Sequence, residues 1–239
     1  MSDWLHRERM LLGDDAVENL KNKKIMIFGI GGVGSYALEA VVRAGVGAVA
    51  LVDSDTVSET NINRQLIADT TTVGRLKTEV AEERCKKINP KIGVERYDIF
   101  ALPDNIPELI EKASPDYIVD AIDTVTSKLS IIKEAKVRGI GIISSMGTGA
   151  KLDPTRFKVV DITKTHTCPL AKVMRIKLRE MGISHCDVLF SDELPIKATA
   201  ASELEGKTTR NIPGSVSFVP SAAGLIIGGW VIRQLCGVK

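Results

Sequence analysis

A glycine-rich segment directly after an apolar run is the feature that most constrains the fold of this chain. The apolar run is Lys24–Phe28, and it leads into Gly29-Ile30-Gly31-Gly32-Val33-Gly34, where a helical pattern begins. Glycines let a backbone turn tightly and approach a ligand, while the amino terminus of the following helix offers unpaired N–H groups. This segment therefore predicts a strand, a nucleotide-binding loop and a helix, in that order.

The residues that follow alternate between apolar strand patterns and helical patterns. Strands are expected near residues 24–29, 48–53, 93–98, 116–122 and 140–145, and helices near residues 33–45, 74–88, 104–113 and 125–138. Such alternation indicates a parallel sheet with right-handed crossovers that binds ligands at the carboxyl ends of its strands. We therefore predict an α/β, Rossmann-like, doubly wound fold with a mainly parallel sheet and an antiparallel C-terminal extension.

The pattern changes after Pro154. An edge strand is expected at 157–161, a helix from about 169 to 181, a strand at 187–190 and a mobile polar loop near 191–213. A last strand at 215–219 is expected to precede a helix that begins at Ser221. Residues 216–232 carry no charge, but Pro220 and three glycines favour a helix buried against the sheet or a subunit partner over a membrane span. Peripheral membrane contact stays open.

We expect one domain over residues 1–239. Its parts are an N-terminal helical arm at 1–23 with a short helix near 14–21, a nucleotide-binding core at 24–150, and an extension at 151–239 on the substrate and dimer side. The composition, 44% hydrophobic and 26% charged, is that of an ordinary soluble protein. The net charge of +2 is too small to indicate a nucleic-acid binder, so any RNA contact must come from a local patch.

The four cysteines contain no Cys-x-x-Cys pair, which argues against a zinc knuckle. They are expected to be reduced thiols. The first residues lack the apolar stretch of a signal peptide, so we expect a cytoplasmic location.

A dense group of polar residues follows the second predicted strand. Asp53 ends that strand, where a carboxylate can accept hydrogen bonds from ribose hydroxyls. The residues beyond it are Asp55, Asn61, Arg64, Gln65 and Lys77. Taken singly, Arg64 or Lys77 would be a solvated surface charge. Beside the glycine loop, however, an arginine fork and amide donors suit a triphosphate better than a redox dinucleotide.

Two acids close the fourth predicted strand. Asp120 and Asp123 lie three residues apart at the strand end, so at least one should face the cleft. A carboxylate there could bind Mg²⁺ together with phosphate oxygens and water. The competing interpretation of Asp123 is a cap on the helix that begins near Val125. For Asp120 we expect hydrogen bonds that order the loop after the first strand.

In combination these motifs resemble the signature of the ubiquitin-activating superfamily of adenylating enzymes, and the resemblance covers about residues 5–150. The motifs are Gly29–Ser35, Asp53-x-Asp55-x-Val57, Asn61-x-x-Arg64-Gln65, Lys77 and Asp120-Ala-Ile-Asp123. The resemblance implies that ATP and Mg²⁺ bind here. It places the nucleotide on the glycine loop and the ribose on Asp53, and it implies Mg²⁺ on Asp123.

The resemblance also implies roles for the remaining polar residues. The phosphates would be bound by Arg64, Gln65 and Lys77, while Asn61 would help shape the transition state. Members are homodimers in which an N-terminal arginine reaches the partner's ATP. Arg7 best matches that position, with Arg9 as the fallback; a solvated terminal arginine is the equal alternative for Arg7.

The second half resembles the tRNA threonylcarbamoyladenosine dehydratase branch of this superfamily. The features are Asp161-Ile-Thr-Lys-Thr165 leading to Cys168-Pro-Leu-Ala171, the polar loop, and Gly214–Pro220 before an apolar helix. The implied reaction uses ATP to adenylate a threonyl carboxylate on a modified adenosine beside the tRNA anticodon, after which a ring closes and AMP leaves. The alternative is an adenylyltransferase that activates the C-terminus of a sulfur-carrier or ubiquitin-like protein. A partner from a sulfurtransferase system stays open.

Two features of the second half have competing interpretations. Cys168 could be an acceptor nucleophile with His166 as its base, but a buried thiol at a helix start is favoured. The following helix carries four cations, Lys172, Arg175, Lys177 and Arg179, which could bind tRNA phosphates or form the solvated face of an amphipathic helix. Lys207 and Arg210 of the polar loop could assist them.

Overall fold

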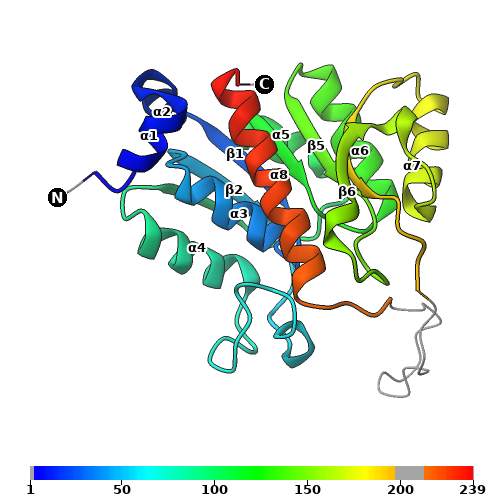
Figure 1. Ribbon diagram of the computed structural model, residues 1–239, viewed down its shortest axis with the longest axis horizontal. Helices are drawn as coiled ribbons and strands as arrows, with labels where there is room; N and C mark the ends of the chain where they lie inside the picture. The colour runs from blue at the N-terminus through cyan, green and yellow to red at the C-terminus, as the bar shows by residue number, and fades with distance from the viewer. Residues whose placement is uncertain (1–2, 197–212, 239) are drawn as a thin grey trace.

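A computed structural model describes residues 3–196 and 213–238, and they form a doubly wound α/β fold around a seven-stranded sheet (Figure 1). The strand order is β3-β2-β1-β4-β5-β7-β6, and every pair is parallel except β6 with β7. The strands are β1 Lys24–Phe28, β2 Ala48–Val52, β3 Gly93–Tyr97, β4 Tyr117–Asp120, β5 Gly141–Ser145, β6 Phe157–Asp161 and β7 Asp187–Ser191. The predicted fold class is therefore confirmed, including the antiparallel pair in the C-terminal part.

Eight α-helices are described. They are α1 His6–Leu12, α2 Asp14–Leu20, α3 Gly34–Arg43, α4 Lys77–Ile88, α5 Ile106–Ala113, α6 Val125–Val137, α7 Pro169–Glu180 and α8 Phe218–Cys236. Most of the loop predicted near 191–213, including Lys207 and Arg210, lies outside the described residues.

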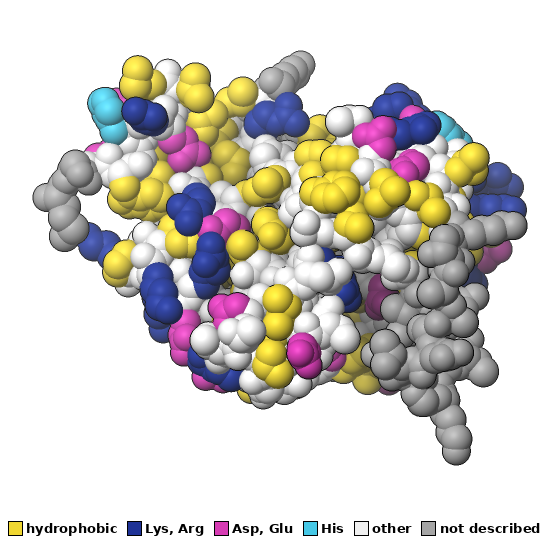
Figure 2. All heavy atoms as spheres, turned by 60° about the horizontal axis from the view of Figure 1, so that its bottom comes forward, with side chains coloured by type: hydrophobic (Ala, Val, Ile, Leu, Met, Phe, Trp, Pro, Cys, Tyr) yellow, Lys and Arg dark blue, Asp and Glu magenta, His cyan; other side chains and the backbone are white. Residues whose placement is uncertain are grey.

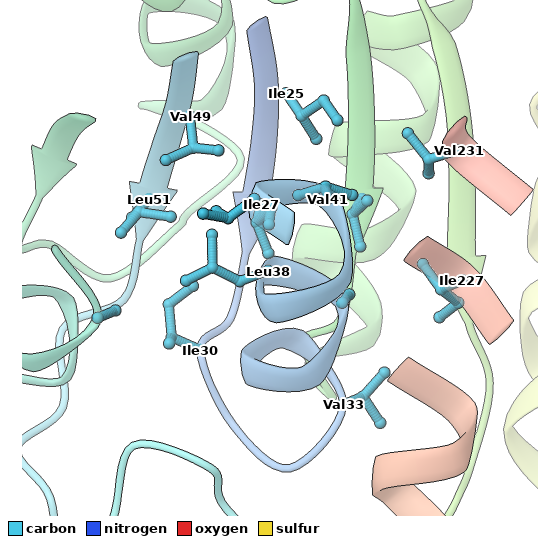
Figure 3. Close-up of a cluster of buried hydrophobic side chains, with 14 of the residues drawn as sticks. Ile25, Ile27, Ile30, Val33, Leu38, Val41, Val49, Leu51, Ile227 and Val231 are labelled. Atoms are coloured by element: carbon cyan, nitrogen blue, oxygen red, sulfur yellow. The ribbon is translucent and has the colours of Figure 1, made fainter. Parts of the chain in front are cut away.

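Alternate side chains of the central strands enter two separate cores, which is why helices cover both faces of the sheet. Ile25 and Ile27 of β1 face a core shared with α2, α3, α4 and α8. Figure 3 shows this core, with Leu38 of α3 near Ile27 and Ile30 and with Ile227 and Val231 of α8 on the other side of α3. The intervening residues of β1 face α5, α6 and α7. The loops at the carboxyl ends of the strands are thereby held between two packed layers.

The last helix differs from the prediction in its start. Residues 215–219 were expected to form a strand, but residues 213–216 have no regular structure and α8 already begins at Phe218. Pro220 falls in the first turn of α8, where a helix does not need the missing N–H group. The expected strand is therefore wrong, because its last apolar residues, Phe218 and Val219, already belong to the first turn of α8.

Helix α8 packs directly on α3, as the interpretation of a buried helix requires. A Cβ at Gly224 would lie 2.3 Å from the carbonyl oxygen of Val33, and one at Gly228 would lie 2.4 Å from Cβ of Ala40. Only glycine permits helices to approach so closely. By length and composition, α8 is the one helix among the described residues that could cross a membrane, with 44% of its apolar window buried in the protein.

The N-terminal arm contains one more helix than expected. The predicted helix near 14–21 is α2, but the preceding α1 has no buried residue among its seven and therefore no apolar periodicity. Leu5, just before α1, is buried and packs against Gly45 at the end of α3. Figure 1 shows α1 and α2 beside the start of β1, at the end of the sheet opposite the glycine loop.

Candidate functional site

A cleft of about 560 Å³ lies at the carboxyl ends of β1, β2, β4 and β5. It brings together nine of the residues predicted for the site: Gly29, Gly31, Gly32, Asp53, Asp55, Arg64, Gln65, Lys77 and Asp123. The cleft is also lined by apolar side chains, among them Ile99, Phe100, Met146 and Leu170. Three predicted residues, Gly34, Asn61 and Arg7, are not among the residues that line it.

The glycine loop has the tight geometry that its sequence predicts. Gly29 has φ +87°, and a Cβ there would lie 2.9 Å from the carbonyl oxygen of Ala121. Gly34 is packed even more closely, because a Cβ would lie 1.8 Å from the carbonyl oxygen of Gly29. Gly34 thus seats α3 against the loop and does not face the cleft. Gly31 does face it, with Nε2 of Gln65 as its nearest neighbour.

Asp53 braces this loop from the next strand. Its Oδ2 accepts the N–H of Ile30 at 2.7 Å, and its Oδ1 accepts the N–H of Asp55 at 2.9 Å. Burial raises the pKa of the Asp53 carboxyl above its usual value, while Lys77 and the two N–H donors oppose that shift. Each oxygen has a further lone pair, so a ribose hydroxyl could still donate to it.

The cations of the cleft differ in how they are neutralised. Lys77, at the start of α4, is buried, and its Nζ lies 2.7 Å from Oδ2 of Asp55. Arg64 donates from Nη1 to the carbonyl of Thr60 and to Oδ1 of Asn63, both at 2.9 Å, and has no carboxylate partner among the described residues. Arg64 therefore brings an uncompensated charge to the cleft.

Gln65 and Asn61 place amide groups near these cations. Oε1 of Gln65 is buried without a hydrogen-bond partner within the described part of the chain, while Nε2 lies 3.9 Å from a Cβ built at Gly31. Asn61 is buried, and its Oδ1 accepts the N–H of Ser58 at 3.2 Å, closing a capping box on the turn at Glu59–Asn61. In this structure Asn61 shapes the turn that carries Arg64.

Asp123 is exposed at the cleft and has no hydrogen-bond or ion-pair partner among the residues described. It does not cap α6, because the residue at that position is Thr124 and no side chain caps the helix. The carboxylate of Asp123 is consequently free to bind a cation.

Asp120 has a different role from the one predicted. Its Oδ2 lies 2.9 Å from Nζ of Lys128 and 2.6 Å from Oγ of Ser144, and both charged side chains are fully buried. Lys128 also donates to the carbonyls of Ile122 and Ser145, at 3.1 and 2.8 Å. These bonds tie together the loops after β4 and β5, which both line the cleft. The expectation that Asp120 orders the loop after β1 is wrong, and Lys128 is a supporting residue that the sequence interpretation missed.

The N-terminal arginines lie outside the cleft of their own chain. Arg9 is neutralised by Asp3, Asp14 and Glu18. Arg7 is exposed on α1 and has no ion pair within the described residues, so it is the better candidate for a contact in trans. Cys168, before α7, is 2% exposed. That burial favours a structural thiol over an acceptor nucleophile.

Comparisons with known proteins agree with this site. The chain matches the ThiF family over residues 5–239. It is 43% identical over 237 residues to a tRNA threonylcarbamoyladenosine dehydratase of Bacillus subtilis strain 168, covering 96% of this chain and 93% of that protein.

Two solved structures extend the comparison to the fold. The E. coli tRNA N6-threonylcarbamoyladenosine dehydratase in complex with AMP matches with a TM-score of 0.89 and 31% identity, over 99% of this chain and 96% of that one. Its complex with ATP matches with a TM-score of 0.86 and 32% identity, over 98% and 93%. The predicted resemblance to adenylating enzymes and to their dehydratase branch is confirmed, and this chain belongs to the ThiF family.

Proposed function

We propose that this chain is an ATP-dependent dehydratase that cyclises threonylcarbamoyladenosine in tRNA through an acyl-adenylate. The observation that carries the proposal is the cleft, where an uncompensated arginine, a buried lysine and the amide side chain of Gln65 line the same cavity as a glycine loop. The similarity to dehydratases extends through the second half of the chain, which is where the branches of the superfamily are expected to differ. The absence of paired Cys-x-x-Cys ligands argues against activation of a sulfur-carrier protein.

The proposed reaction has two steps. A carboxylate oxygen of the threonyl group attacks the α-phosphorus of ATP, the bond to the bridging oxygen breaks, and pyrophosphate leaves. A nucleophilic atom of the same threonylcarbamoyl group then attacks the activated carbonyl carbon, and AMP leaves with the former carboxylate oxygen. One proton is lost from the nucleophile, so the net change is loss of one water. Because the attacking group is already tethered, proximity supplies much of the acceleration.

The chain's own residues bind and orient the reactants. The N–H groups of the glycine loop face the phosphates, and Arg64 and Lys77 offset their charge. Asp55 holds the Lys77 ammonium at 2.7 Å, so a bound phosphate would share this lysine with Asp55. Asp53 keeps the loop in place and accepts from the ribose, while Gln65 offers its amide.

Magnesium fits this donor set. No group of three or more His, Cys, Asp or Glu side chains that could hold a metal occurs in the described part of the chain. Mg²⁺ does not need one, because it is commonly held by one or two carboxylates with substrate phosphates and water. Asp123 would supply that carboxylate, and the ion would neutralise phosphate charge.

The remaining expectations are also part of the proposal. The chain would act as a homodimer, with Arg7 reaching the ATP of the partner subunit. The division into an arm at 1–23, a core at 24–150 and an extension at 151–239 stays a prediction, as do the cytoplasmic location, a sulfurtransferase-system partner and peripheral membrane contact.

The direct test uses the full-length protein, ATP and tRNA isolated from cells that lack this gene. We expect AMP release together with loss of one water mass from the threonylcarbamoyladenosine, measured by mass spectrometry of the nucleosides. A carrier protein with a C-terminal Gly-Gly tail is the matched alternative substrate. AMP release or acyl-adenylate formation with that tail, and none with tRNA, would refute the proposal.

A further inference from the structure

The short segment that ends with α7 is strongly basic. Residues 162–181 contain five Lys or Arg residues and one Glu, a net charge of +4, whereas the whole chain carries +2. The rest of the chain therefore sums to −2. Because the net charge of the whole chain is small, any contact with a polyanion must come from a local basic patch of this kind.

Three of these cations share one face of α7. Lys172, Arg175 and Arg179 occur at positions i, i+3 and i+7, while Ala171, Met174 and Leu178 form the buried face. Arg175 donates to the carbonyl and hydroxyl of Thr165, at 2.8 and 2.7 Å, and the exposed Lys164 directly precedes Thr165 in the chain. We call Lys164, Lys172, Arg175 and Arg179 the α7 patch.

The α7 patch has no carboxylate partner. None of its four residues forms an ion pair within residues 3–196 and 213–238, although many other cations of the chain do, including Arg75, Arg84 and Arg96. Like charges three or four positions apart destabilise a helix. Folding alone does not explain this arrangement, whereas an external anion would.

The α7 patch lies on the helix whose first turn lines the nucleotide cleft. Leu170, in that turn, lines the cleft, and Lys172 lies in the same turn, about 200° farther around the helix axis. Figure 2 shows dark blue Lys and Arg side chains along its right-hand border, the side on which α7 lies in Figure 1. A long anion bound there could place one end at the reacting phosphates.

We propose that the α7 patch binds the phosphate backbone of the RNA substrate and so directs its modified nucleotide into the cleft. This proposal rests on the proposed function for the identity of the RNA. Exposed Lys and Arg side chains that contact phosphates position a nucleic acid without reading its sequence, so the patch would set affinity and orientation.

The test compares two double variants with the same change in charge. Lys172→Glu with Arg179→Glu reverses the patch. Lys87→Glu with Lys91→Glu is the control, because both lysines are exposed, have no ion pair among the described residues, and lie at the far end of α4. Binding of labelled tRNA is measured without ATP at several salt concentrations, and ATP binding is measured separately.

We expect the patch variant to weaken tRNA binding at least about tenfold, and to lower the salt slope by about 1.5 if two phosphate contacts are lost. The control should bind tRNA within about twofold of the unmodified protein, because overall charge alone has a small effect at physiological salt. ATP binding should be unchanged in both, and the loss with modified tRNA should appear in KM and not in kcat.

Equal tRNA binding by both variants would overturn the proposal, as would equal loss in both. The proposal would also be overturned if the patch variant bound tRNA as well as the unmodified protein does but bound vesicles of phosphatidylserine and phosphatidylcholine more weakly. If the unmodified protein binds tRNA through the patch yet never dehydrates it, the proposed function fails while the α7 patch stands.

Discussion

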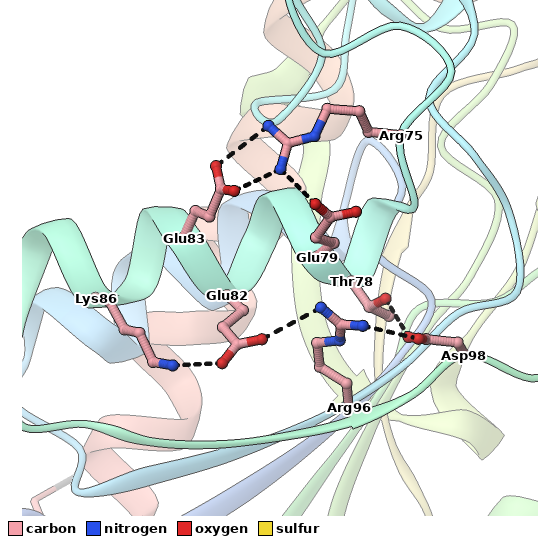
Figure 4. Close-up of polar contacts among 8 residues, drawn as sticks. All are labelled: Arg75, Thr78, Glu79, Glu82, Glu83, Lys86, Arg96 and Asp98. Carbon is pink, nitrogen blue, oxygen red and sulfur yellow. Dashed lines mark hydrogen bonds and ion pairs between the residues drawn. The ribbon is translucent and has the colours of Figure 1, made fainter.

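Helices α4 and α7 each contain twelve residues and four cations, but they treat charge in opposite ways. On and beside α4 nearly every cation has a carboxylate: Arg75 pairs with Glu79 and Glu83, and Arg96 with Glu82 and Asp98 (Figure 4). On α7 none of the four cations forms an ion pair within the described residues. The cations near α4 are thus mostly neutralised within the protein, whereas those of α7 are available to an anionic ligand.

The same distinction holds between the cations that line the cleft and the buried lysine that contacts its lining residues. Lys128 is fully buried and paired with Asp120, and Lys77 is buried and paired with Asp55. Arg64 has only neutral partners in the described structure. We infer that the fully buried Lys128 holds the loops in place, that the unpaired Arg64 faces phosphate, and that Lys77, buried beside Asp55, does both. Substitutions can separate these classes, because the first should change stability and the second should change function.

The largest effect is expected from Lys128→Met. Removing one partner of a buried ion pair leaves Asp120 charged in an apolar interior, and such a change costs about 3–5 kcal/mol. Chemical denaturation should show this loss in the free energy of unfolding. The double variant with Asp120→Asn should recover part of it; an unfolding midpoint for Lys128→Met equal to that of the unmodified protein would contradict the assignment.

Arg64→Ala should have the next largest effect. It should lower the catalytic activity and leave the stability of the protein nearly unchanged. Loss of a preorganised donor to a developing anion typically lowers a rate by about 10²–10³. Steady-state AMP release with modified tRNA would measure this, and thermal unfolding without ligand should stay within about 1 kcal/mol of the unmodified protein because no ion pair is lost. Full turnover by the variant would remove Arg64 from the mechanism.

Asp123→Asn tests the same distinction between paired and unpaired charges on an acidic residue. Its carboxylate has no protein partner to lose within the described residues, so stability should hardly change. Turnover should fall by about tenfold or more if this carboxylate binds Mg²⁺, and higher Mg²⁺ concentrations should restore part of it. Unchanged turnover across a Mg²⁺ titration would place the metal elsewhere.

The difference between these residues also explains what the sequence could reveal. The glycine loop and Asp53 directly follow strands, Arg64 and Lys77 follow Asp53 in a recognisable order, and all of them line one cleft. Lys128 has no comparable signal, because a lysine in a helical pattern normally indicates an exposed position.

The errors at the two ends of the chain have similar physical causes. Helix α1 buries no side chain, so it has no apolar period to detect. The start of α8 is apolar on successive residues, a pattern that fits a strand as well as a buried helix. Only packing against α3 decides between these structures.

Ile176→Glu would give the cations of α7 a carboxylate partner, as those of α4 have. Its effect on the protein should be smaller than that of Asp123→Asn. Ile176 is 50% exposed and lies four positions after Lys172 and three before Arg179, so a glutamate there could pair with both. Each new pair should stabilise the helix by about 0.2–0.5 kcal/mol. Binding of tRNA should weaken a few-fold, while Leu225→Glu on α8, which is also 50% exposed, should leave it unchanged.

Glu82→Gln should have the smallest effect of all. Glu82 contacts Lys86 and Arg96, but these pairs are near the surface of α4, and such pairs contribute about 0.2–1 kcal/mol each. Denaturation at low and high salt should reveal the loss only at low salt, because surface pairs are screened. The variant should bind tRNA and turn over ATP as the unmodified protein does, since the cations that lose a partner, Lys86 of α4 and Arg96 of β3, are not on α7, and Arg96 keeps Asp98. A clear gain in tRNA affinity would show that any uncompensated cation attracts the substrate, and the contrast between α4 and α7 would then lose its meaning.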